Sequence, residues 1–139
     1  MAEIRSCVAQ RFLVAALLLT AGCSSFTTPS DLTGPWGGEH IALVVTDTGS
    51  TVEFDCASGT ITEPLALGPI GKFDATGTFT PGHGGPILQG ETPDSHPARY
   101  TGQVKGNTMT LTIVETDSGT NLGTFTLQRG VAARVFKCL

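Results

Sequence analysis

Apolar residues recur at every second position through most of the chain after Gly34, and this period constrains the fold most strongly. The clearest runs place apolar side chains at one parity and polar or small side chains at the other, over residues 41–45, 52–56, 73–79, 100–104, 109–113 and 125–127. A period of two puts alternate side chains on opposite faces of an extended strand. Threonine fills many of the polar positions, and its β-branched side chain suits a pleated surface. The pattern predicts half-buried antiparallel strands. After Gly34 only residues 131–139 could equally be helical.

Turn residues separate these runs at short intervals. They are Asp47-Thr48-Gly49-Ser50, Lys105-Gly106-Asn107 and Asp117-Ser118-Gly119-Thr120. An aspartate that opens a turn and a glycine in a left-handed position favour tight hairpins. About seven or eight short strands joined in this way predict an all-β fold, a single small up-and-down β-barrel over 34–139. A compact β-sandwich is the alternative. Closure favours the barrel because it removes exposed strand edges.

The first 22 residues have the plan of a secretory leader. Arg5 and Arg11 precede an apolar run from Phe12 to Ala21, and small residues come before Cys23. The run is ten residues long, whereas a membrane-spanning helix needs about twenty.

The stretch 17–23, Leu-Leu-Leu-Thr-Ala-Gly-Cys, resembles the lipobox of bacterial lipoprotein precursors. Thr20 stands where that box prefers leucine. In this family the leader, here 1–22, is removed and the cysteine is acylated, which implies a lipid on Cys23. Two acyl chains suffice for stable anchoring. Ser24, in place of the aspartate linked to inner-membrane retention, favours the outer membrane if the source has one, and otherwise the outer face of the cytoplasmic membrane.

Residues 23–33 lack apolar periodicity and are expected to form the lipidated N-terminus and a flexible tether, with a reach of roughly 15–20 Å. The whole chain has a net charge of −4 and the leader carries +1, so the rest carries −5. An acidic chain with scattered lysines and arginines has no electrostatic footprint for nucleic acid and no polybasic cluster for anionic lipid. Membrane attachment is therefore expected through the acyl chains.

The chain has four cysteines, and their positions predict different roles for them. Cys7 leaves with the leader and Cys23 takes the lipid, so Cys56 and Cys138 remain. One even pair in an exported chain predicts a disulfide. A reactive or metal-binding thiol is the alternative, but neither cysteine has CxxC spacing. We expect the disulfide to join regions where the first and last strands meet.

One segment is too long for a simple connection. Residues 81–98 hold four prolines and four glycines. His83 and His96 lie in it and could meet Asp94 as a metal or ligand site, although their spacing is not that of a known metal motif. The third histidine, His40, is adjacent to Glu39 on an expected strand, so the two side chains should face opposite ways.

The two motifs Asp47-Thr48-Gly49-Ser50 and Asp117-Ser118-Gly119-Thr120 resemble the paired signatures of pepsin-like aspartic proteases. Those enzymes use two carboxylates that share a proton. Each lobe in that family is longer than this whole exported chain, and a threonine precedes each aspartate here. Hairpin turns explain both motifs better, and an aspartic-type hydrolase is the third and weakest functional hypothesis.

Gly34-Pro35-Trp36 resembles the G-x-W that opens the first strand of lipocalins, avidins and related calycin barrels. In that family the tryptophan plugs the closed end and the open end binds a small molecule or a protein. The overall plan of lipobox, short barrel and disulfide is also similar to that of small lipoprotein lysozyme inhibitors. Trp36 and Tyr100, with His83, Asp94 and His96, are therefore candidate contacts for a ligand or partner.

Two functional hypotheses follow. The first is a lipid-anchored, non-enzymatic barrel that binds a small apolar ligand. An eight-stranded barrel is either filled by side chains or has room for one small ligand, and the sequence leaves both open. The second is a protein-interaction or inhibitor module, with an envelope protein as its partner, acting through residues 81–98. No catalytic set converges and no cofactor motif is present in the sequence.

Overall fold

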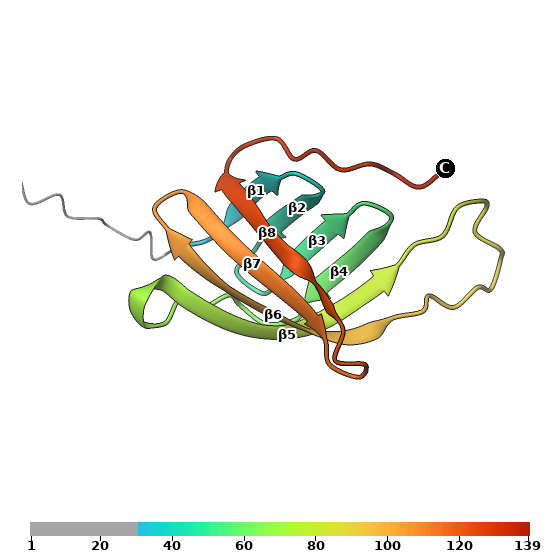
Figure 1. Ribbon diagram of the computed structural model, residues 1–139, viewed down its shortest axis with the longest axis horizontal. Helices are drawn as coiled ribbons and strands as arrows, with labels where there is room; N and C mark the ends of the chain where they lie inside the picture. Colours follow the sequence, from blue (N-terminus) through green and yellow to red (C-terminus); the bar gives the residue numbers. More distant parts are fainter. Residues whose placement is uncertain (1–30) are drawn as a thin grey trace, which may run out of the picture.

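The computed structural model describes residues 31–139, and these form eight antiparallel strands in a closed barrel (Figure 1). The predicted leader 1–22, the lipid site Cys23 and most of the predicted tether lie outside the described residues. The strands are β1 (Gly34–Gly38), β2 (Ile41–Val45), β3 (Ser50–Phe54), β4 (Ala57–Ile61), β5 (Lys72–Pro81), β6 (His96–Lys105), β7 (Thr108–Glu115) and β8 (Asn121–Arg129), with one 3₁₀ turn, η1 (Pro69–Gly71).

Every strand pairs with its neighbours in sequence, and β1 closes the sheet by pairing with β8 in the register Trp36↔Arg129. The predicted up-and-down barrel is confirmed, and the sandwich alternative is wrong. The first four strands have five residues each, whereas β5 to β8 have eight to ten. The longer strands extend past the shorter ones, so the barrel is lopsided (Figure 1).

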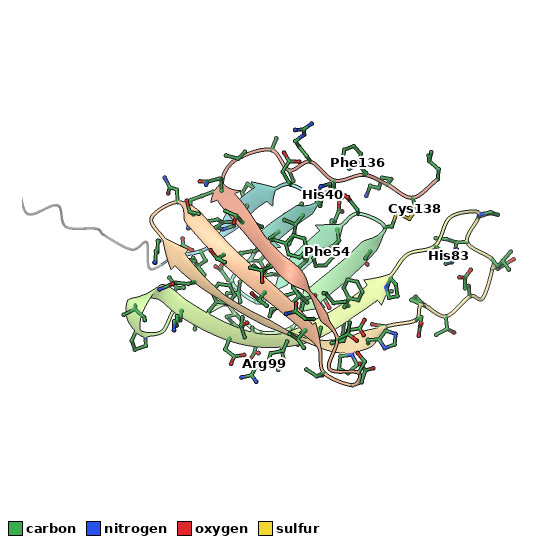
Figure 2. The ribbon with its side chains drawn as sticks, viewed as in Figure 1. His40, Phe54, His83, Arg99, Phe136 and Cys138 are labelled. Carbon is green, nitrogen blue, oxygen red and sulfur yellow. A yellow bond between two sulfur atoms is a disulfide. The ribbon has the colours of Figure 1, made fainter. Side chains whose placement is uncertain are left out.

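The predicted alternation places one parity of each strand inside the barrel. The buried apolar residues are Leu32, Trp36, Ile41, Leu43, Val45, Val52, Phe54, Ile61, Phe73, Ala75, Ala98, Tyr100, Val104, Met109, Leu111, Ile113 and Leu127. Ten of these seventeen residues expose less than 2% of their surface, and together the side chains fill the lumen over most of its length. The outer face carries threonine pairs such as Thr112 with Thr124 and the Arg99–Asp74 ion pair (Figure 2).

The interior is packed closely enough that some positions accept only glycine. A Cβ on Gly59 of β4 would lie 2.1 Å from the Tyr100 hydroxyl oxygen and 2.8 Å from the Thr78 carbonyl oxygen. The same hydroxyl donates a hydrogen bond to Thr78 O at 2.7 Å. The tyrosine therefore occupies the space that a β4 side chain would take.

Trp36 seals one end of the barrel, which we call the closed end. Its side chain is buried, and its indole Nε1 donates to Leu32 O at 2.9 Å. The Arg129 guanidinium lies 4.9 Å from the centre of the indole ring and donates to Asp31 O. A cation over an indole face is attracted by the ring's negative surface. The contacts fix the start of the described chain to the closed end.

The segment after β8, residues 130–139, runs back along the outside of the barrel to the opposite, open end (Figure 1). It crosses β1 over Gly37, where a Cβ would lie 2.1 Å from Val131 O. Arg134 is hydrogen-bonded through its backbone to Gly38 and His40. The predicted Cys56–Cys138 disulfide then fastens the segment at the open end. We refer to residues 130–139 as the C-terminal strap.

Three details of the prediction were wrong. Cys56 is not in a strand but in the turn between β3 and β4, so the disulfide joins that turn to the strap rather than the first strand to the last. Glu39 and His40 form the β1–β2 turn instead of a strand. The long connection is shorter than 81–98, because β5 continues to Pro81 and β6 begins at His96 with Phe79 opposite it. In the described part of the chain, no helix has the length and apolar character needed to cross a membrane.

Candidate functional site

A cavity of about 210 Å³ opens at the mouth of the barrel, at the end away from Trp36. It exists because the short strands stop before the long ones, which leaves the last inward-facing side chains without a complete ring around them. Its lining residues, called the mouth site below, are His40, Phe54, Asp55, Ala57, Phe79, Leu122 and Phe125.

Three phenylalanines form the apolar part of the mouth site. Phe54, from β3, lies at their centre, with ring-centre distances of 5.5 Å to Phe79 of β5 and 5.7 Å to Phe125 of β8. Phe54 is buried, but Phe79 and Phe125 remain half-buried. Tilted and edge-on arrangements of this kind are favourable between aromatic rings. They leave ring faces and edges available to a further flat, apolar group.

The rim of the mouth site is polar on one side. His40 Nδ1 and Asp55 Oδ2 are 2.5 Å apart, and the Asp55 Oδ1 atom accepts a hydrogen bond of 2.7 Å from the Phe136 backbone N–H. The bond from Phe136 and, second to it, the contact with His40 hold the pKa of Asp55 below its usual value. The His40 ring lies 5.9 Å from the Phe136 ring, and Figure 2 shows Phe136 on the strap beside His40. The strap thus builds part of the rim.

The two turns that supply this rim are strained. His40 has φ of 65° and Cys56 has φ of 55°, a left-handed conformation that residues other than glycine adopt rarely. Such conformations persist only where surrounding contacts enforce them, and they concentrate at functional sites. Here the His40–Asp55 contact and the disulfide are the enforcing contacts.

Residues 82–95, called the long loop below, form a second feature of the open end. A cavity of about 360 Å³ lies between this loop and the ends of β4 and β5, and Ala57 lines both this cavity and the mouth site. His83 Nε2 lies 2.5 Å from Glu91 Oε1, and the pKa of His83 is raised by a hydrogen bond with Gly84 O and by Glu91. The loop displays two highly exposed apolar side chains, Ile87 (83% exposed) and Leu88 (69%).

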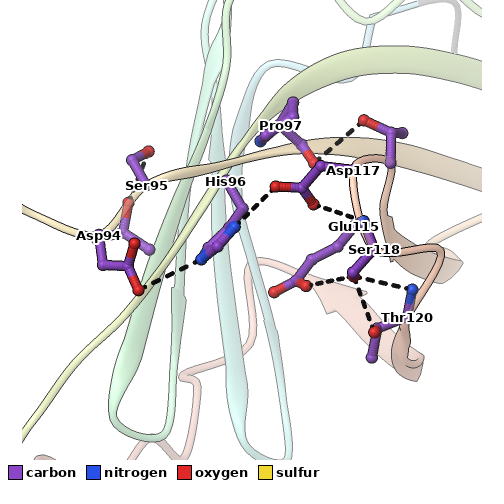
Figure 3. Close-up of polar contacts among 10 residues, drawn as sticks. Asp94, Ser95, His96, Pro97, Glu115, Asp117, Ser118 and Thr120 are labelled. Carbon is purple, nitrogen blue, oxygen red and sulfur yellow. Dashed lines mark hydrogen bonds and ion pairs between the residues drawn. The ribbon is translucent and has the colours of Figure 1, made fainter.

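His96 stands between carboxylates where the long loop enters β6 (Figure 3). Its Nδ1 atom lies 2.8 Å from Asp117 Oδ2 and its Nε2 atom 3.4 Å from Asp94 Oδ2. The contact with Asp117, followed by that with Asp94, raises the pKa of His96, and the same histidine lowers the pKa of Asp117. Both ring nitrogens face carboxylates, so the imidazole connects the long loop to the β7–β8 turn, and its protonated form can donate to both sides.

The same place has the composition of a metal site. One ligand atom each from His96, Glu115 and Asp117 lie within 4.8 Å of one another. Their hydrogen bonds, including Ser118 Oγ to Glu115 at 2.7 Å and the Ser118 backbone N–H to Asp117 at 2.8 Å, already account for the arrangement without an ion.

The residues predicted from the sequence do not form a single site. His96 and Asp94 meet as expected, but His83 pairs with Glu91 rather than with them. Trp36 and Tyr100 are buried within the barrel, where they pack the interior. Their predicted contact with a ligand stays untested, and neither residue lines the mouth site.

Sequence reasoning missed the mouth site itself. Phe54, Phe79 and Phe125 were recognised only as inward-facing members of their strands. Phe54 and Phe79 are the last large apolar residues of β3 and β5 at the open end, whereas in β8 Leu122 lies beyond Phe125 at that end; this was the available signal. Because the connections of a meander alternate between the two ends, the ends of β3 and β5 and the start of β8 could have been grouped.

The two aspartic-protease-like motifs are turns at opposite ends of the barrel. Asp47 lies in the β2–β3 turn at the closed end, whereas Asp117 lies in the β7–β8 turn at the open end. The two carboxylates therefore cannot share a proton or a water molecule. No protein-family model, curated protein or solved structure matches this chain.

Proposed function

We propose that this chain is a lipid-anchored, exported, non-enzymatic barrel that binds a small ring-containing molecule at its mouth site. The observation that supports this most is the 210 Å³ cavity between Phe54, Phe79 and Phe125. The site is shallower than the lumen considered from the sequence, because the lumen is filled. A cavity of about 150 Å³ with apolar walls is enough for benzene, so one ring with a small substituent fits.

The chemistry of the walls narrows the ligand class. The floor offers only apolar and aromatic groups, whereas His40 and Asp55 stand at the rim. A flat apolar ring would stack on the phenylalanines, and a polar substituent would point outward toward the rim. Indole and phenol have this character. For a molecule of about nine heavy atoms, a binding free energy of about 0.6 kcal/mol per atom, between the limits for very small and for drug-sized ligands, gives a dissociation constant on the order of 10⁻⁴ M.

Calorimetric titration of the oxidised protein with indole tests the binding. A matched pair of variants separates the site from the rest of the surface. Ala57→Leu adds side-chain volume at the wall of the mouth site, and Val44→Ala changes an exposed residue on the outer face of β2. We expect Ala57→Leu to weaken indole at least tenfold and Val44→Ala to leave it unchanged. Equal affinities in all three proteins would refute the assignment.

The anchor is tested separately. Cys23→Ala should move the chain from the membrane fraction to the aqueous fraction, because the proposed attachment depends on acyl chains at that residue. If the variant stays in the membrane fraction, attachment has another cause.

A second function, protein binding by the long loop, is favoured by the exposure of Ile87 and Leu88 on a loop that is held by its own hydrogen bonds. A photo-crosslinking amino acid at position 87 should form a discrete adduct in the envelope, and the same group at position 44 should not. Deletion of residues 84–90 from the chain without the crosslinking group should abolish pull-down of the partner identified in that adduct while the barrel still folds. Identical adducts from both positions would mean non-specific contact.

A further inference from the structure

The segment 64–71, Pro-Leu-Ala-Leu-Gly-Pro-Ile-Gly, is an exposed apolar loop at the closed end, between β4 and β5. It contains no charged residue. Leu65 and Leu67 are partly buried against the core, whereas Pro64, Ala66, Pro69 and Ile70 face solvent. We call this segment the apolar loop.

Ile70 is the most unusual residue of the apolar loop. It has φ of 58° within η1, and its side chain is 73% exposed. A β-branched residue in the left-handed region is a true outlier. Its exposed side chain has no packing in the described structure to offset the strain, and such strain concentrates where function requires it.

Hydrogen bonds hold the apolar loop in this shape, and the nearby Glu63 carboxylate points away from its tip. Gln103 Nε2 donates to Ile70 O at 2.9 Å, and the Gly68 N–H donates to Lys72 O at 2.7 Å. The Glu63 carboxylate is turned back toward β5, where it accepts bonds from Thr76 N and Thr76 Oγ1. The apolar tip is therefore preformed.

The apolar loop lies at the same end as the start of the described chain (Figure 1). Asp31 and Leu32 are fixed there by Arg129 and Trp36. Eight residues, 23–30, precede Asp31 from the proposed lipid site onward, and a fully extended chain of that length spans at most about 29 Å. A lipid on Cys23 would hold this end, and not the mouth, near the bilayer.

The charge distribution agrees with this orientation. Lys72 and Lys105 flank the closed end and are exposed. Asp47 lies at the same end, so the charge there is mixed and the apolar residues must supply the contact. The open end, by contrast, carries the carboxylates Asp55, Glu91, Asp94, Glu115 and Asp117. An anionic surface would repel that end.

We infer that the apolar loop rests in the headgroup region of the bilayer, with Ile70 inserted among the lipids and the mouth site facing the aqueous compartment. This inference rests on the proposed lipid anchor. It makes the closed end a second membrane contact, and this contact adds to the anchor because both belong to one molecule.

Tryptophan fluorescence tests the inference, because the chain has only one tryptophan, Trp36, and it is buried. Full-length protein would be produced in a bacterium that processes lipoproteins, extracted from membranes and reconstituted into phosphatidylethanolamine–phosphatidylglycerol vesicles. The variants are Ile70→Trp and Ala66→Trp in the apolar loop, and Ile87→Trp in the long loop as the matched control. Lipids brominated near the headgroups quench only tryptophans that reach them.

We expect bromination to remove at least half of the added emission of Ile70→Trp and Ala66→Trp, and to leave that of Ile87→Trp unchanged. Vesicle flotation of the wild type and Cys23→Ala reports the anchor independently. If the wild type floats through Cys23 but neither loop tryptophan is quenched, the docking inference is wrong and the anchor stands. If only Ile87→Trp is quenched, the orientation is reversed. If the wild type does not float, both the anchor and the docking are refuted. Far-ultraviolet circular dichroism of each variant checks folding.

Discussion

Replacing Gly59 by alanine tests whether the barrel interior is filled in the way described above. The new Cβ would lie 2.1 Å from the Tyr100 hydroxyl oxygen and 2.8 Å from Thr78 O. Tyr100 is fully buried, and Thr78 O belongs to the β4–β5 part of the sheet, so neither can move freely. Overpacking of this kind costs about 1–3 kcal/mol. We expect Gly59→Ala to lower the free energy of unfolding by about 2–3 kcal/mol, the upper part of that range.

The conservative variant Tyr100→Phe removes the atom that would clash. Alone it loses one buried hydrogen bond, at a cost of about 1 kcal/mol. In the double variant, the alanine Cβ would still approach Thr78 O at 2.8 Å, but the nearest remaining ring atom would be 3.3 Å away. The double variant should therefore be about 1 kcal/mol more stable than the sum of the two single effects predicts.

Guanidinium unfolding of the oxidised protein, followed by Trp36 fluorescence, measures all four members of this cycle. Trp36 is buried at the closed end, so its emission should change sharply when the barrel opens. A neutral Gly59→Ala would show that the space beside Tyr100 is empty. Strict additivity would show that the hydroxyl is not the obstacle. The first result would refute the description of a filled lumen, and the second would refute the role of the Tyr100 hydroxyl in filling it.

Two further predictions concern the open end. Replacing both Cys56 and Cys138 by serine removes a crosslink with a sequence separation of 82 residues, which should lower the free energy of unfolding by about 4 kcal/mol in the chain-entropy model; an unchanged guanidinium midpoint would contradict this. The His96–Asp117 contact should depend on pH in a defined window. The pKa of His96 is raised above 6.5, so the contact stabilises the folded protein fully below about that pH, and this stabilisation is lost as the pH rises through the pKa that His96 has in the folded protein. The pKa of Asp117 is lowered, so the contact is also lost in acid, as the pH falls through a value below 3.8. Hydrogen exchange of residues 82–95, corrected for intrinsic rates, should therefore be slower at about pH 5.5 than at about pH 8. The His83–Glu91 contact in the same loop changes in the same direction, so His96→Gln should reduce the difference and the double variant with His83→Gln should remove it; equal protection at both values in the wild type would refute the link.

The barrel was predictable because one physical rule repeats along the chain. Ile41, Leu43 and Val45 had to face one side of a strand and Val44 the other, and the same rule applied to each later run. The turns at Asp47 and Asp117 limited the strand lengths. Sequential hairpins with buried inner faces are compatible with few strand arrangements. Closure into a barrel pairs the first strand with the last and so leaves no unpaired strand edge.

Strand ends were less predictable because periodicity continues through a tight turn without a break. Cys56 has the same parity as Val52 and Phe54, yet the chain reverses at Asp55-Cys56. Its left-handed φ and the disulfide, rather than a turn-forming residue such as glycine, make that reversal. The β1–β2 turn at His40 likewise has a left-handed residue that is not glycine, so the sequence pattern does not mark it as a turn.

The local pattern marks the strand ends that meet at the mouth site but does not predict its geometry. It depends on the difference in length between β1–β4 and β5–β8, and on where the strap returns. Phe54, Phe79 and Phe125 are far apart in sequence, and only the closed register brings their rings within 5.5–5.7 Å. Trp36, which the sequence marked most clearly, instead packs beneath Arg129 at the other end.

The most direct test of the account is to locate a bound ring by nuclear magnetic resonance. Intermolecular nuclear Overhauser effects would be measured between unlabelled indole and isotope-labelled oxidised protein. The account predicts cross-peaks from indole to the rings of Phe54, Phe79 and Phe125, and none to Trp36 or Tyr100 within the lumen. Cross-peaks to Trp36 or Tyr100 would place the ligand inside the barrel and contradict the filled interior. The absence of cross-peaks to the three phenylalanines at saturating indole would refute the mouth site.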